Sequence, residues 1–396
     1  MAEQPPRADA RTGQYLRAQG GRDGYWAFHP RPLPPRPPLT IDARMQGLLD
    51  RANQELGRLD GVTLLLPDPD QFIYTFVRKE AVLSSQIEGT QSSLSDLLLF
   101  ENDGAPGVPR EDAQETANYI LAMNHGLEQI ARAGAPPLSN RLLRDVHRIL
   151  LGGGRGSDMA PGEFRRTQNW LGGLRPSEAR FVPPPPNEVP GAMGALEKFL
   201  HDDPDPTPVL IKAALAHAQF ETIHPFLDGN GRVGRLLITL LLCSEGVLAR
   251  PLLYLSLYFK RHRDAYYDHL QAVRTDGTWE EWLRFFLEGV IDVARSATDA
   301  TRRIVAMVER DRRKVQGLGR GAGTALRVHD LATRYVVVRA SRAAEELGLS
   351  PPPVYNALAR LEAAGILREV TGRRRGKLYV YSEYLAIVNE GTEARP

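Results

Sequence analysis

The chain has 396 residues, of which 42% are hydrophobic and 25% are charged, and its formal net charge is +2 with a pI near 8.6. This length can bury a substantial core and predicts two domains plus an N-terminal appendage. The near balance of charge does not require a polyanionic partner, the single cysteine excludes an internal disulfide framework, and no stretch approaches the roughly 20 apolar residues that cross a bilayer.

The first 110 residues divide into two parts. Residues 1–40 form a proline-rich N-terminal segment, in which Pro30–Pro38 predicts an extended strap or a flexible lead outside the core. The first residues lack the basic and apolar regions of a secretion signal, which together with the lone cysteine favours a cytoplasmic protein. Residues 41–110 are expected to form an N-terminal helical region.

Within this region, residues 79–90 carry a polar pair at helical spacing. Ser84 and Glu88 are four residues apart and would share one face of a helix, which Gly89 would end. Pairs of this kind are common on solvated helix faces. Alone, the pair therefore predicts a helix end and no particular function.

Apolar residues at helical spacing dominate the middle of the chain and predict a mainly α fold. The segments with this pattern are Ala113–Ile130, Leu138–Leu151, Val189–Leu200, Pro208–Glu221, Arg235–Glu245 and Trp279–Val308. Long strand patterns are nearly absent. The exception is Gly162–Gly173 followed by Ala179–Val182, which predicts a short β-hairpin around a glycine-containing turn.

The most informative stretch is His224–Arg235, which precedes an apolar helix. Gly229 and Gly231 allow backbone N–H groups to turn inward, and the positive end of the following helix dipole points at the same place. Arg232 and Arg235 are three residues apart on the first helical turn and suit neighbouring phosphate oxygens. These features predict a phosphate-binding loop.

Two further residues of this stretch suggest chemistry at that loop. His224 has a side chain that is mostly neutral at cytosolic pH and accepts a proton. Asp228 supplies the hard oxygen that Mg²⁺ prefers when the ion also contacts substrate phosphates. The loop is therefore expected to combine a phosphate site, a metal carboxylate and a base.

The order of these residues resembles the signature of the Fic (filamentation induced by cAMP) family, His-Pro-Phe-x-Asp/Glu-Gly-Asn-Gly-Arg-x-x-Arg, and all nine specified positions match. The resemblance implies a Fic helical domain with a short β-hairpin flap. Fic enzymes usually transfer the AMP moiety of ATP to a Ser, Thr or Tyr hydroxyl of a target protein. The resemblance therefore implies a protein adenylyltransferase with ATP as co-substrate and Mg²⁺ as cofactor.

The family pattern also implies a role for each matching residue. His224 would be the catalytic base, and Asp228 would hold Mg²⁺. The ATP-binding residues implied in this way are Gly229, Asn230, Gly231, Arg232 and Arg235, to which similarity of layout adds Gln219 on the preceding helix and Tyr267 near the adenine or ribose.

The segment around Ser84 and Glu88 resembles the inhibitory helix of Fic proteins, Ser/Thr-x-x-x-Glu-Gly/Asn. In that resemblance Glu88 pairs with Arg235 and occupies the guanidinium that the γ-phosphate needs. The alternative is that Glu88 assists a reverse reaction that removes AMP. The predicted hairpin resembles the Fic flap, whose edge would add a target loop as a strand over His224; it would otherwise only cover the core edge.

The last part of the chain changes character near Lys314–Gly323, where glycine and arginine indicate a linker. Ser341–Ser350 and Pro351–Gly365 predict two helices, and Ile366–Val370 and Leu378–Tyr381 predict two strands around an arginine-rich turn. This order resembles a winged helix-turn-helix.

Such a module binds either DNA or protein. The basic turn and Arg360 favour DNA, whereas the predicted recognition helix offers few groups suited to base edges, Asn356 being the clearest. Both alternatives stay open. Fic proteins often self-associate, so a homo-oligomer is a further expectation, although no heptad pattern is visible.

The expected domain organisation is residues 1–40 as the N-terminal segment, 41–110 as the helical region with the inhibitory motif, 111–312 as the Fic catalytic domain, 313–324 as a linker and 325–390 as the winged helix-turn-helix domain. Three functions compete. The first is AMP transfer inhibited by Glu88, the second is another nucleotide or phospho-donor or AMP removal at the same site, and the third is a DNA-binding regulator whose Fic domain senses nucleotide.

Overall fold

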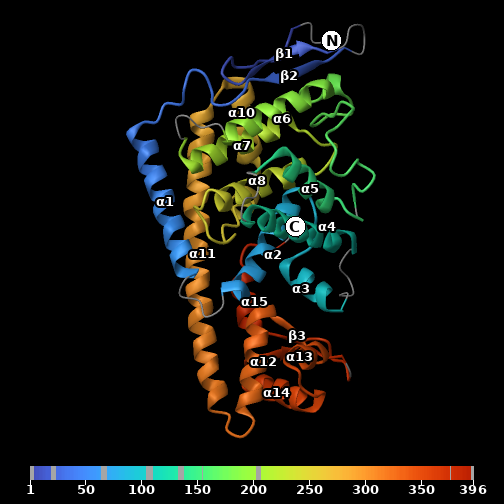
Figure 1. The fold of residues 1–396 in the computed structure, drawn as a ribbon, viewed down its shortest axis with the longest axis vertical. Helices are drawn as coiled ribbons and strands as arrows, with labels where there is room; N and C mark the ends of the chain where they lie inside the picture. The colour runs from blue at the N-terminus through green and yellow to red at the C-terminus, as the bar shows by residue number, and fades with distance from the viewer. Residues whose placement is uncertain are drawn as a thin grey trace. The chain divides into compact units, whose positions relative to one another are not determined.

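The computed structural model describes residues 4–18, 24–63, 69–103, 110–132, 138–153, 155–201, 207–374 and 376–393. Helices make up most of this part of the chain, and the strands are few and short (Figure 1). The expected mainly α fold is therefore confirmed. Among the described residues, no helix combines the length and the apolar character that crossing a membrane requires.

The elements of the first half are, in chain order, β1 (Gly13–Arg17), β2 (Trp26–Pro30), α1 (Ala43–Thr63), α2 (Pro69–Ile87), α3 (Leu94–Asp103), α4 (Arg110–Ala131), α5 (Asn140–Leu150), the 3₁₀ turns η1 (Pro176–Glu178) and η2 (Pro186–Glu188), α6 (Val189–His201) and α7 (Val209–Ile223). Those of the second half are α8 (Asn230–Ser244), α9 (Ser256–Arg261), α10 (Arg263–Asp276), α11 (Trp279–Gln316), α12 (Ala322–Tyr335), β3 (Val337–Arg339), α13 (Ala340–Leu347), α14 (Pro351–Ala363), β4 (Arg368–Glu369), β5 (Leu378–Val380) and α15 (Ser382–Asn389).

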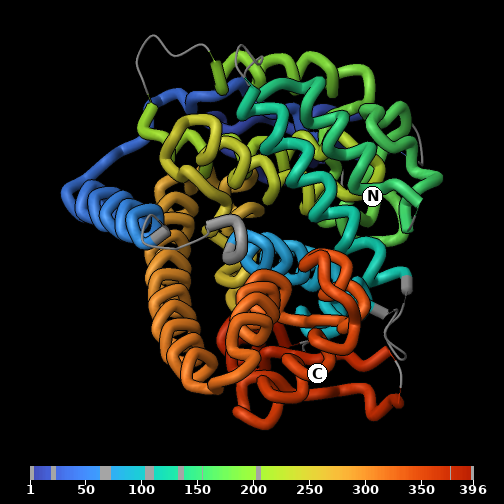
Figure 2. The backbone as a smooth tube through the Cα atoms, turned by 60° about the horizontal axis from the view of Figure 1, so that its bottom comes forward, coloured from blue at the N-terminus to red at the C-terminus, as the bar shows by residue number. Residues whose placement is uncertain are grey.

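The described chain forms two compact units (Figures 1 and 2). Unit 1 takes in the described parts of Met1–Gly57, Ala117–Ala249 and Tyr258–Asp292. Unit 2 takes in those of Arg58–Thr116, Arg250–Leu257 and Val293–Pro396. The signature loop between α7 and α8 belongs to unit 1, whereas α2 and the C-terminal helices belong to unit 2.

Helix α7 is the centre of unit 1. Every residue from Leu210 to Ile223 is buried, because other elements cover the helix on all sides. The indole N–H of Trp282 on α11 donates to the carbonyl of Ala214 at 2.9 Å. Helix α8 packs closely against α7 at Gly234, where an added Cβ would lie 2.5 Å from Oε1 of Glu221. Because α7 and α8 are packed closely together, both ends of the loop that joins them are fixed.

The N-terminal segment forms a hairpin that the sequence did not predict. Strands β1 and β2 are antiparallel, with Gly13 opposite Pro30. Phe28 is fully buried and its N–H donates to the carbonyl of Val182 at 2.8 Å. An ion pair of 2.9 Å joins Arg11 to Glu280. The strands were missed because they are stabilised by packing against Val182, a residue far away in the sequence, and not by a pattern of their own.

The predicted hairpin at 162–182 is reduced to a single antiparallel bridge between Leu171 and Phe181. Glycines at 172 and 173 take positive φ, and η1 fills the turn, so the segment has little regular strand structure. The tip is exposed, and the side chain of Leu174 is 91% accessible.

Two predicted helix bounds differ from the structure by five residues or more. Helix α8 begins at Asn230, five residues before the predicted start at Arg235, because Gly229 at φ 74° provides its N-cap. Helix α11 continues to Gln316, into the predicted linker, because its last turns still bury an apolar residue, Val315. Only residues 317–321 separate α11 from α12.

In unit 2 the C-terminal residues pack onto α2. The Lys79 ammonium donates to the carbonyl of Glu390 at 2.8 Å. The Gln86 amide donates to the carbonyls of Ser92 and Thr392, both at 2.9 Å. The last turn of α2, just before Glu88, is thereby tied to the end of the described chain.

The remaining C-terminal elements form a three-stranded antiparallel sheet in the order β3-β5-β4 with helices α12, α13 and α14. Both predicted strands are present but shorter than expected, as β4 and β5, while β3 and α12 were not predicted. The Tyr381 hydroxyl donates to the buried carboxylate of Asp311 at 2.8 Å. Identification of this region as a winged helix-turn-helix stays a prediction.

Candidate active site

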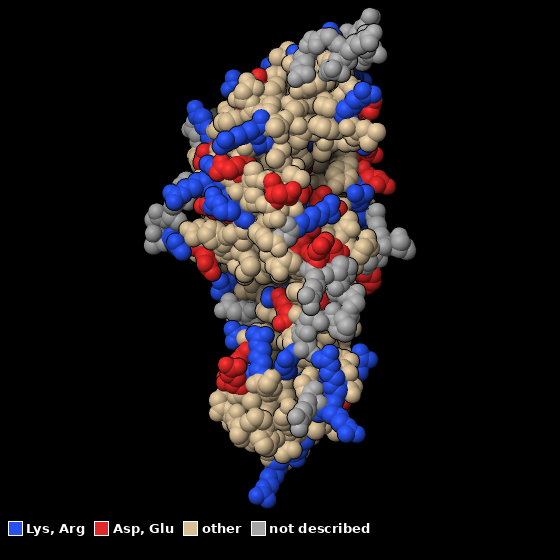
Figure 3. All heavy atoms as spheres, turned by 90° about the vertical axis from the view of Figure 1, so that its right-hand side faces the viewer, with Lys and Arg blue, Asp and Glu red and all other residues tan. Residues whose placement is uncertain are grey.

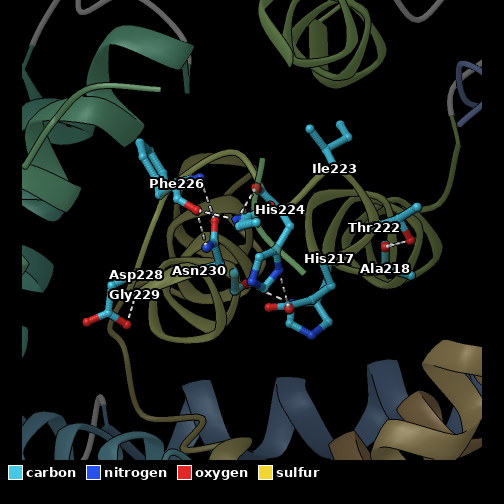
Figure 4. A network of polar contacts seen from close by, with 12 residues as sticks. His217, Ala218, Thr222, Ile223, His224, Phe226, Asp228, Gly229 and Asn230 are labelled. Carbon is cyan, nitrogen blue, oxygen red and sulfur yellow. Dashed lines mark hydrogen bonds and ion pairs between the residues drawn. The ribbon is translucent and has the colours of Figure 1, made fainter. Parts of the chain in front are cut away.

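The candidate site starts where α7 ends. His224 caps the helix in the left-handed region, with φ 50° and ψ 59°, and its N–H donates to the carbonyl of Phe220 at 2.9 Å. A non-glycine residue rarely takes this conformation, and it persists only where the surroundings enforce it. It turns the chain sharply, so that His224 stands at the entrance of the loop leading to α8 (Figure 4).

Asn230 closes this loop. Its side-chain oxygen accepts from the N–H of Phe226, and its amide donates to the Phe226 carbonyl, each at 2.8 Å (Figure 4). The side chain is buried and fully engaged with the loop. What Asn230 offers to a ligand is its backbone N–H at the start of α8, where the first N–H groups have no acceptor within the helix.

His147 on α5 supports the same loop and was not predicted. Its ring stacks on that of Phe226, with centroids 3.7 Å apart. The N–H of Gly162 donates to Nδ1 at 2.8 Å, so Nε2 carries the proton and donates to the Asp228 carbonyl at 3.0 Å. Burial lowers the pKa of His147 to about 4, which keeps this tautomer neutral.

Arg165 is the second supporting residue that the sequence did not reveal. It is 2% exposed, and its Nε donates to the carbonyl of His224 at 2.9 Å. Burial lowers its pKa to about 10, so the guanidinium still carries its charge at neutral pH. The only sequence signal would have been a basic residue inside an otherwise glycine-rich turn segment.

Two guanidiniums lie on the first turns of α8, as the sequence predicted. Arg232 is 3% exposed and Arg235 is 2% exposed. The Arg232 guanidinium lies 3.6 Å from the carboxylate of Asp228, whose side chain is 38% exposed. Buried positive charge at the N-terminal end of a helix is an electrostatic setting that favours phosphate oxygens.

Glu221 adds a buried carboxylate beside the histidine. Its Oε2 lies 3.9 Å from Nδ1 of His224, one helical turn away, and its side chain is 8% exposed. The Arg274 guanidinium donates to the Glu221 carbonyl at 3.1 Å and fixes the end of α7. A carboxylate at this place orients the imidazole by charge rather than by a close hydrogen bond.

Gln219 and Tyr267, the two ATP-binding residues predicted outside the signature, make contacts with other parts of the chain than the loop. The Gln219 amide donates to the carbonyl of Arg31 at 2.9 Å, so its side chain holds the N-terminal segment against α7. Tyr267 on α10 is partly buried, with the Arg263 guanidinium 5.2 Å from the centre of its ring. Their roles in ATP binding stay predictions.

Ser84 and Glu88 belong to unit 2. Ser84 lies in α2 and is fully buried, whereas Glu88 follows the last helical residue and is exposed. The N–H of Glu88 donates to the Ser85 carbonyl at 3.0 Å, and Gly89 ends the turn at φ 105°. Arg235 belongs to unit 1, and the pairing of Glu88 with it stays a proposal.

Asp228 suits a metal that is shared with a substrate. Its Oδ1 accepts from the N–H of Gly229 at 2.7 Å, which orients the carboxylate, and the side chain is partly exposed. Across the described residues, no group of three or more His, Cys, Asp and Glu side chains is placed to hold a metal ion. The single carboxylate of Asp228 could supply one oxygen ligand to an ion that also binds substrate phosphates.

Comparison with known proteins agrees with this geometry. Residues 46–128 match the Fic/DOC family N-terminal region and residues 137–242 match the Fic/DOC family domain. The protein adenylyltransferase Fic of Culex quinquefasciatus is 35% identical over 147 residues, which is 37% of this chain and 26% of the relative. That of Drosophila melanogaster is 32% identical over 175 residues, 43% of this chain and 32% of the relative. The chain thus spans about a quarter to a third of these curated relatives.

Solved structures share the fold. A Fic family protein from Desulfovibrio desulfuricans has a TM-score of 0.56 at 20% identity and covers 87% of this chain and 97% of its own. A Fic domain containing signaling protein from Bacteroides thetaiotaomicron has a TM-score of 0.51 at 19% identity and covers 64% of this chain and 97% of its own.

In this chain two buried helices are joined by a glycine-rich loop, with a histidine at the entrance of the loop and arginines behind it. This arrangement is that of proteins with the Fic fold. The chain carries the N-terminal region of the Fic/DOC family at residues 46–128 and the Fic/DOC domain at residues 137–242.

Proposed function

We propose that the chain transfers AMP from ATP to a Ser, Thr or Tyr hydroxyl of a target protein. The observation that carries the proposal is the setting of one loop, with His224 at its entrance and the buried guanidiniums of Arg232 and Arg235 behind it. The name of the curated relatives, protein adenylyltransferase, supports the same reaction.

In the proposed reaction the acceptor oxygen attacks the α-phosphorus, the bond to the β-phosphate breaks, and pyrophosphate leaves. His224 takes the proton of the acceptor hydroxyl. The backbone N–H groups of Asn230 and Gly231 stabilise the charge that builds up on the phosphate oxygens, whereas the N–H of Gly229 donates to the Asp228 carboxylate. Arg232 and Arg235 bind the β- and γ-phosphates. Asp228 would hold Mg²⁺, which would neutralise charge on the phosphates and on the departing pyrophosphate.

We also propose that Glu88 inhibits this reaction. The negative charge of Glu88 would pair with Arg235 and compete with the γ-phosphate, so that ATP binds only in an unproductive pose. The position of Glu88 just beyond the end of α2 supports the proposal, because its side chain is exposed at the surface of unit 2.

Intact-mass measurement of the Glu88→Gly variant with Mg²⁺ and ATP tests both proposals. A gain of one AMP, absent when His224 is also replaced by alanine, is the expected result. A different adduct would favour another donor, and removal of AMP from a modified protein would favour the reverse reaction. A wild-type chain that is as active as Glu88→Gly would contradict inhibition.

The C-terminal region favours a second, separate role. We propose that α12 to β5 form a winged helix-turn-helix, because their order and the β3-β5-β4 sheet match that module. On the face shown in Figure 3, Lys and Arg side chains are spread from top to bottom and include the lower part, where Figure 1 places α12 to α14. Arg373 and Arg374 lie in the described turn, and Arg375 lies outside the described residues.

DNA binding and protein docking remain the alternatives for this module. Arg360 donates to the carbonyls of Leu318 and Arg320, so it secures the turn before α12 and is less suited to phosphate. Salt-dependent binding of the full chain to duplex DNA, lost in Arg373→Ala with Arg374→Ala, would establish DNA as the partner. Equal binding by that variant would favour docking to protein.

Two broader expectations complete the proposal. A cytoplasmic location is inferred from the single cysteine, Cys243, which fits a reducing compartment. A homo-oligomer is inferred from the family alone, and sedimentation measurements over a range of concentrations would test it.

A further inference from the structure

The guanidinium of Arg165 contacts the backbone on both sides of the flap segment, defined here as residues 165–184. The backbone N–H of Arg165 donates to the carbonyl of Pro225 at 2.9 Å, and the side-chain Nε donates to the carbonyl of His224 at 2.9 Å. Nη2 donates to the carbonyl of Pro184 and, at 3.4 Å, to that of Ile223. One side chain therefore joins both ends of the flap segment to the backbone around the histidine.

Two neighbouring amides reinforce this connection. The Asn169 amide donates to the carbonyl of Phe226 at 2.8 Å, two residues beyond His224. The Gln168 amide donates to the carbonyl of Pro183 at 3.0 Å, next to the exit of the flap segment. The flap segment and the entrance of the loop therefore share one hydrogen-bonded network.

Arg165 carries a charge that burial makes costly. Its side chain is almost completely buried, and within the described chain its charge meets carbonyl oxygens without a carboxylate ion pair. A structural hydrogen bond to a carbonyl requires no charge, so the arginine is better explained by its geometry. Only a planar fork with several N–H groups reaches carbonyls in three directions at once.

The backbone conformation of His224 explains why Arg165 binds at this place. His224 lies in the left-handed region at φ 50°, and its carbonyl, which this turn directs toward the flap segment, is the one that Arg165 Nε binds. The flap segment also carries two exposed apolar side chains, Trp170 and Leu174. An acceptor that is bound by the flap segment can react only if its hydroxyl lies next to the imidazole of His224.

We propose that Arg165 is a positioning residue, which keeps the flap segment in register with His224 so that an acceptor hydroxyl held by the flap meets the imidazole. This inference rests on the proposed AMP transfer. It separates Arg165 from the residues that bind ATP, because all of its contacts go to the flap segment and the entrance of the loop and none to the first turn of α8.

The test replaces Arg165 with lysine in the Glu88→Gly chain. Lysine keeps the charge but replaces the planar fork with a single ammonium, so it cannot reproduce the separate bonds of Nε to His224 and of Nη2 to Pro184. Arg166→Lys is the matched control, because Arg166 is the next residue and is exposed. Auto-modification is followed with α-labelled ATP, and ATP affinity is measured separately by calorimetry.

We expect the maximal rate of Arg165→Lys to fall about 10- to 100-fold, with ATP affinity within about two-fold of the control. Loss of ATP affinity in parallel with rate would show a merely structural role and overturn the proposal, as would a rate equal to that of Arg166→Lys. If Arg165→Lys does not fold, Asn169→Ala in the same background is expected to lower the rate selectively, and unchanged kinetics there would overturn the proposal.

The control also distinguishes the inference from the proposed function. If Arg166→Lys transfers no AMP, the proposed reaction fails and the inference fails with it. If both variants transfer AMP at the same rate, the reaction stands and only the role of Arg165 is refuted.

Discussion

The ring of His147 lies flat on the ring of Phe226, with centroids 3.7 Å apart and planes 6° apart. The same imidazole accepts from the N–H of Gly162 and donates to the Asp228 carbonyl. A side chain on α5, remote in sequence, thus fixes two residues of the signature loop. The structural role of the loop's central phenylalanine follows from this contact.

This contact makes stability depend on pH. Burial lowers the pKa of His147 from 6.5 to about 4, so the unfolded chain takes up a proton first as the pH falls. The stability contributed by neutral His147 is complete above about pH 6.5 and is lost progressively down to pH 4, by about 3 kcal/mol. Buried His217, with a pKa lowered to about 3, acts in the same direction.

Replacement of His147 by phenylalanine checks this. The variant keeps an aromatic ring against Phe226 but leaves the Gly162 N–H without its acceptor, so it should lose about 1–3 kcal/mol at pH 7. Its free energy of unfolding, measured in urea from pH 7 to pH 4.5, should fall less steeply than that of the wild type. As a control, His125→Phe, at a partly exposed position, should keep the wild-type dependence of the unfolding free energy on pH. If His147→Phe also keeps the wild-type dependence, His147 is not the group responsible.

Gly234→Ala should destabilise unit 1. An added Cβ would lie 2.5 Å from Oε1 of Glu221 and 3.2 Å from the ring of Phe220, inside a packed helix pair. Overpacking of this kind costs about 1–3 kcal/mol, and it would displace the carboxylate beside His224. The free energy of unfolding, measured in urea, and the AMP-transfer rate should both decrease.

Gly194 on α6 is the control for that change. No atom lies within 4 Å of a Cβ added there, so alanine should raise stability by about 0.5–1 kcal/mol through helix propensity. Equal effects of the two replacements would show that the contact between α7 and α8 is less close than the structure indicates.

Asn230→Asp should damage the loop without changing its size. The carboxylate still accepts from the Phe226 N–H, but its second oxygen now faces the Phe226 carbonyl and repels it. We expect a loss of about 1–3 kcal/mol in stability and a fall of roughly 100-fold in the transfer rate. Asn356→Asp, on an exposed part of α14, should change neither quantity.

His224→Ala should abolish transfer while ATP affinity is largely retained, because in the proposed reaction the imidazole accepts the proton and Arg232 and Arg235 bind the phosphates. His224→Asn tests the chemistry with less disturbance, since asparagine tolerates positive φ better than alanine does. Both variants are assayed with α-labelled ATP in the Glu88→Gly chain. Retained transfer in either would remove His224 from the role of base.

The sequence was most informative where function is concentrated in consecutive residues. Glycines, arginines and a histidine within His224–Arg235 predicted a loop entering a helix, and the structure has that arrangement. The start of α8 was placed too late because Gly229 and Gly231 weaken helix propensity, although a left-handed glycine at the N-cap lets the helix begin there.

The supporting residues could not be predicted because their partners are far away in sequence. His147 lies 81 residues before the Asp228 carbonyl that it binds, and Arg165 lies 59 residues before His224. Periodicity shows which face of a helix is buried, but not which backbone carbonyl a buried polar side chain reaches. The N-terminal hairpin was missed for a related reason, since short strands are stabilised by packing against Val182 and not by their own pattern.

The attachment of Thr392 and Glu390 to Gln86 and Lys79 has a practical consequence. Ending the chain at Asn389 would leave every signature residue in place, yet it would withdraw two acceptors from α2 and loosen the turn that presents Glu88. If Glu88 inhibits transfer as proposed, residues 390–392 should therefore influence the extent of that inhibition.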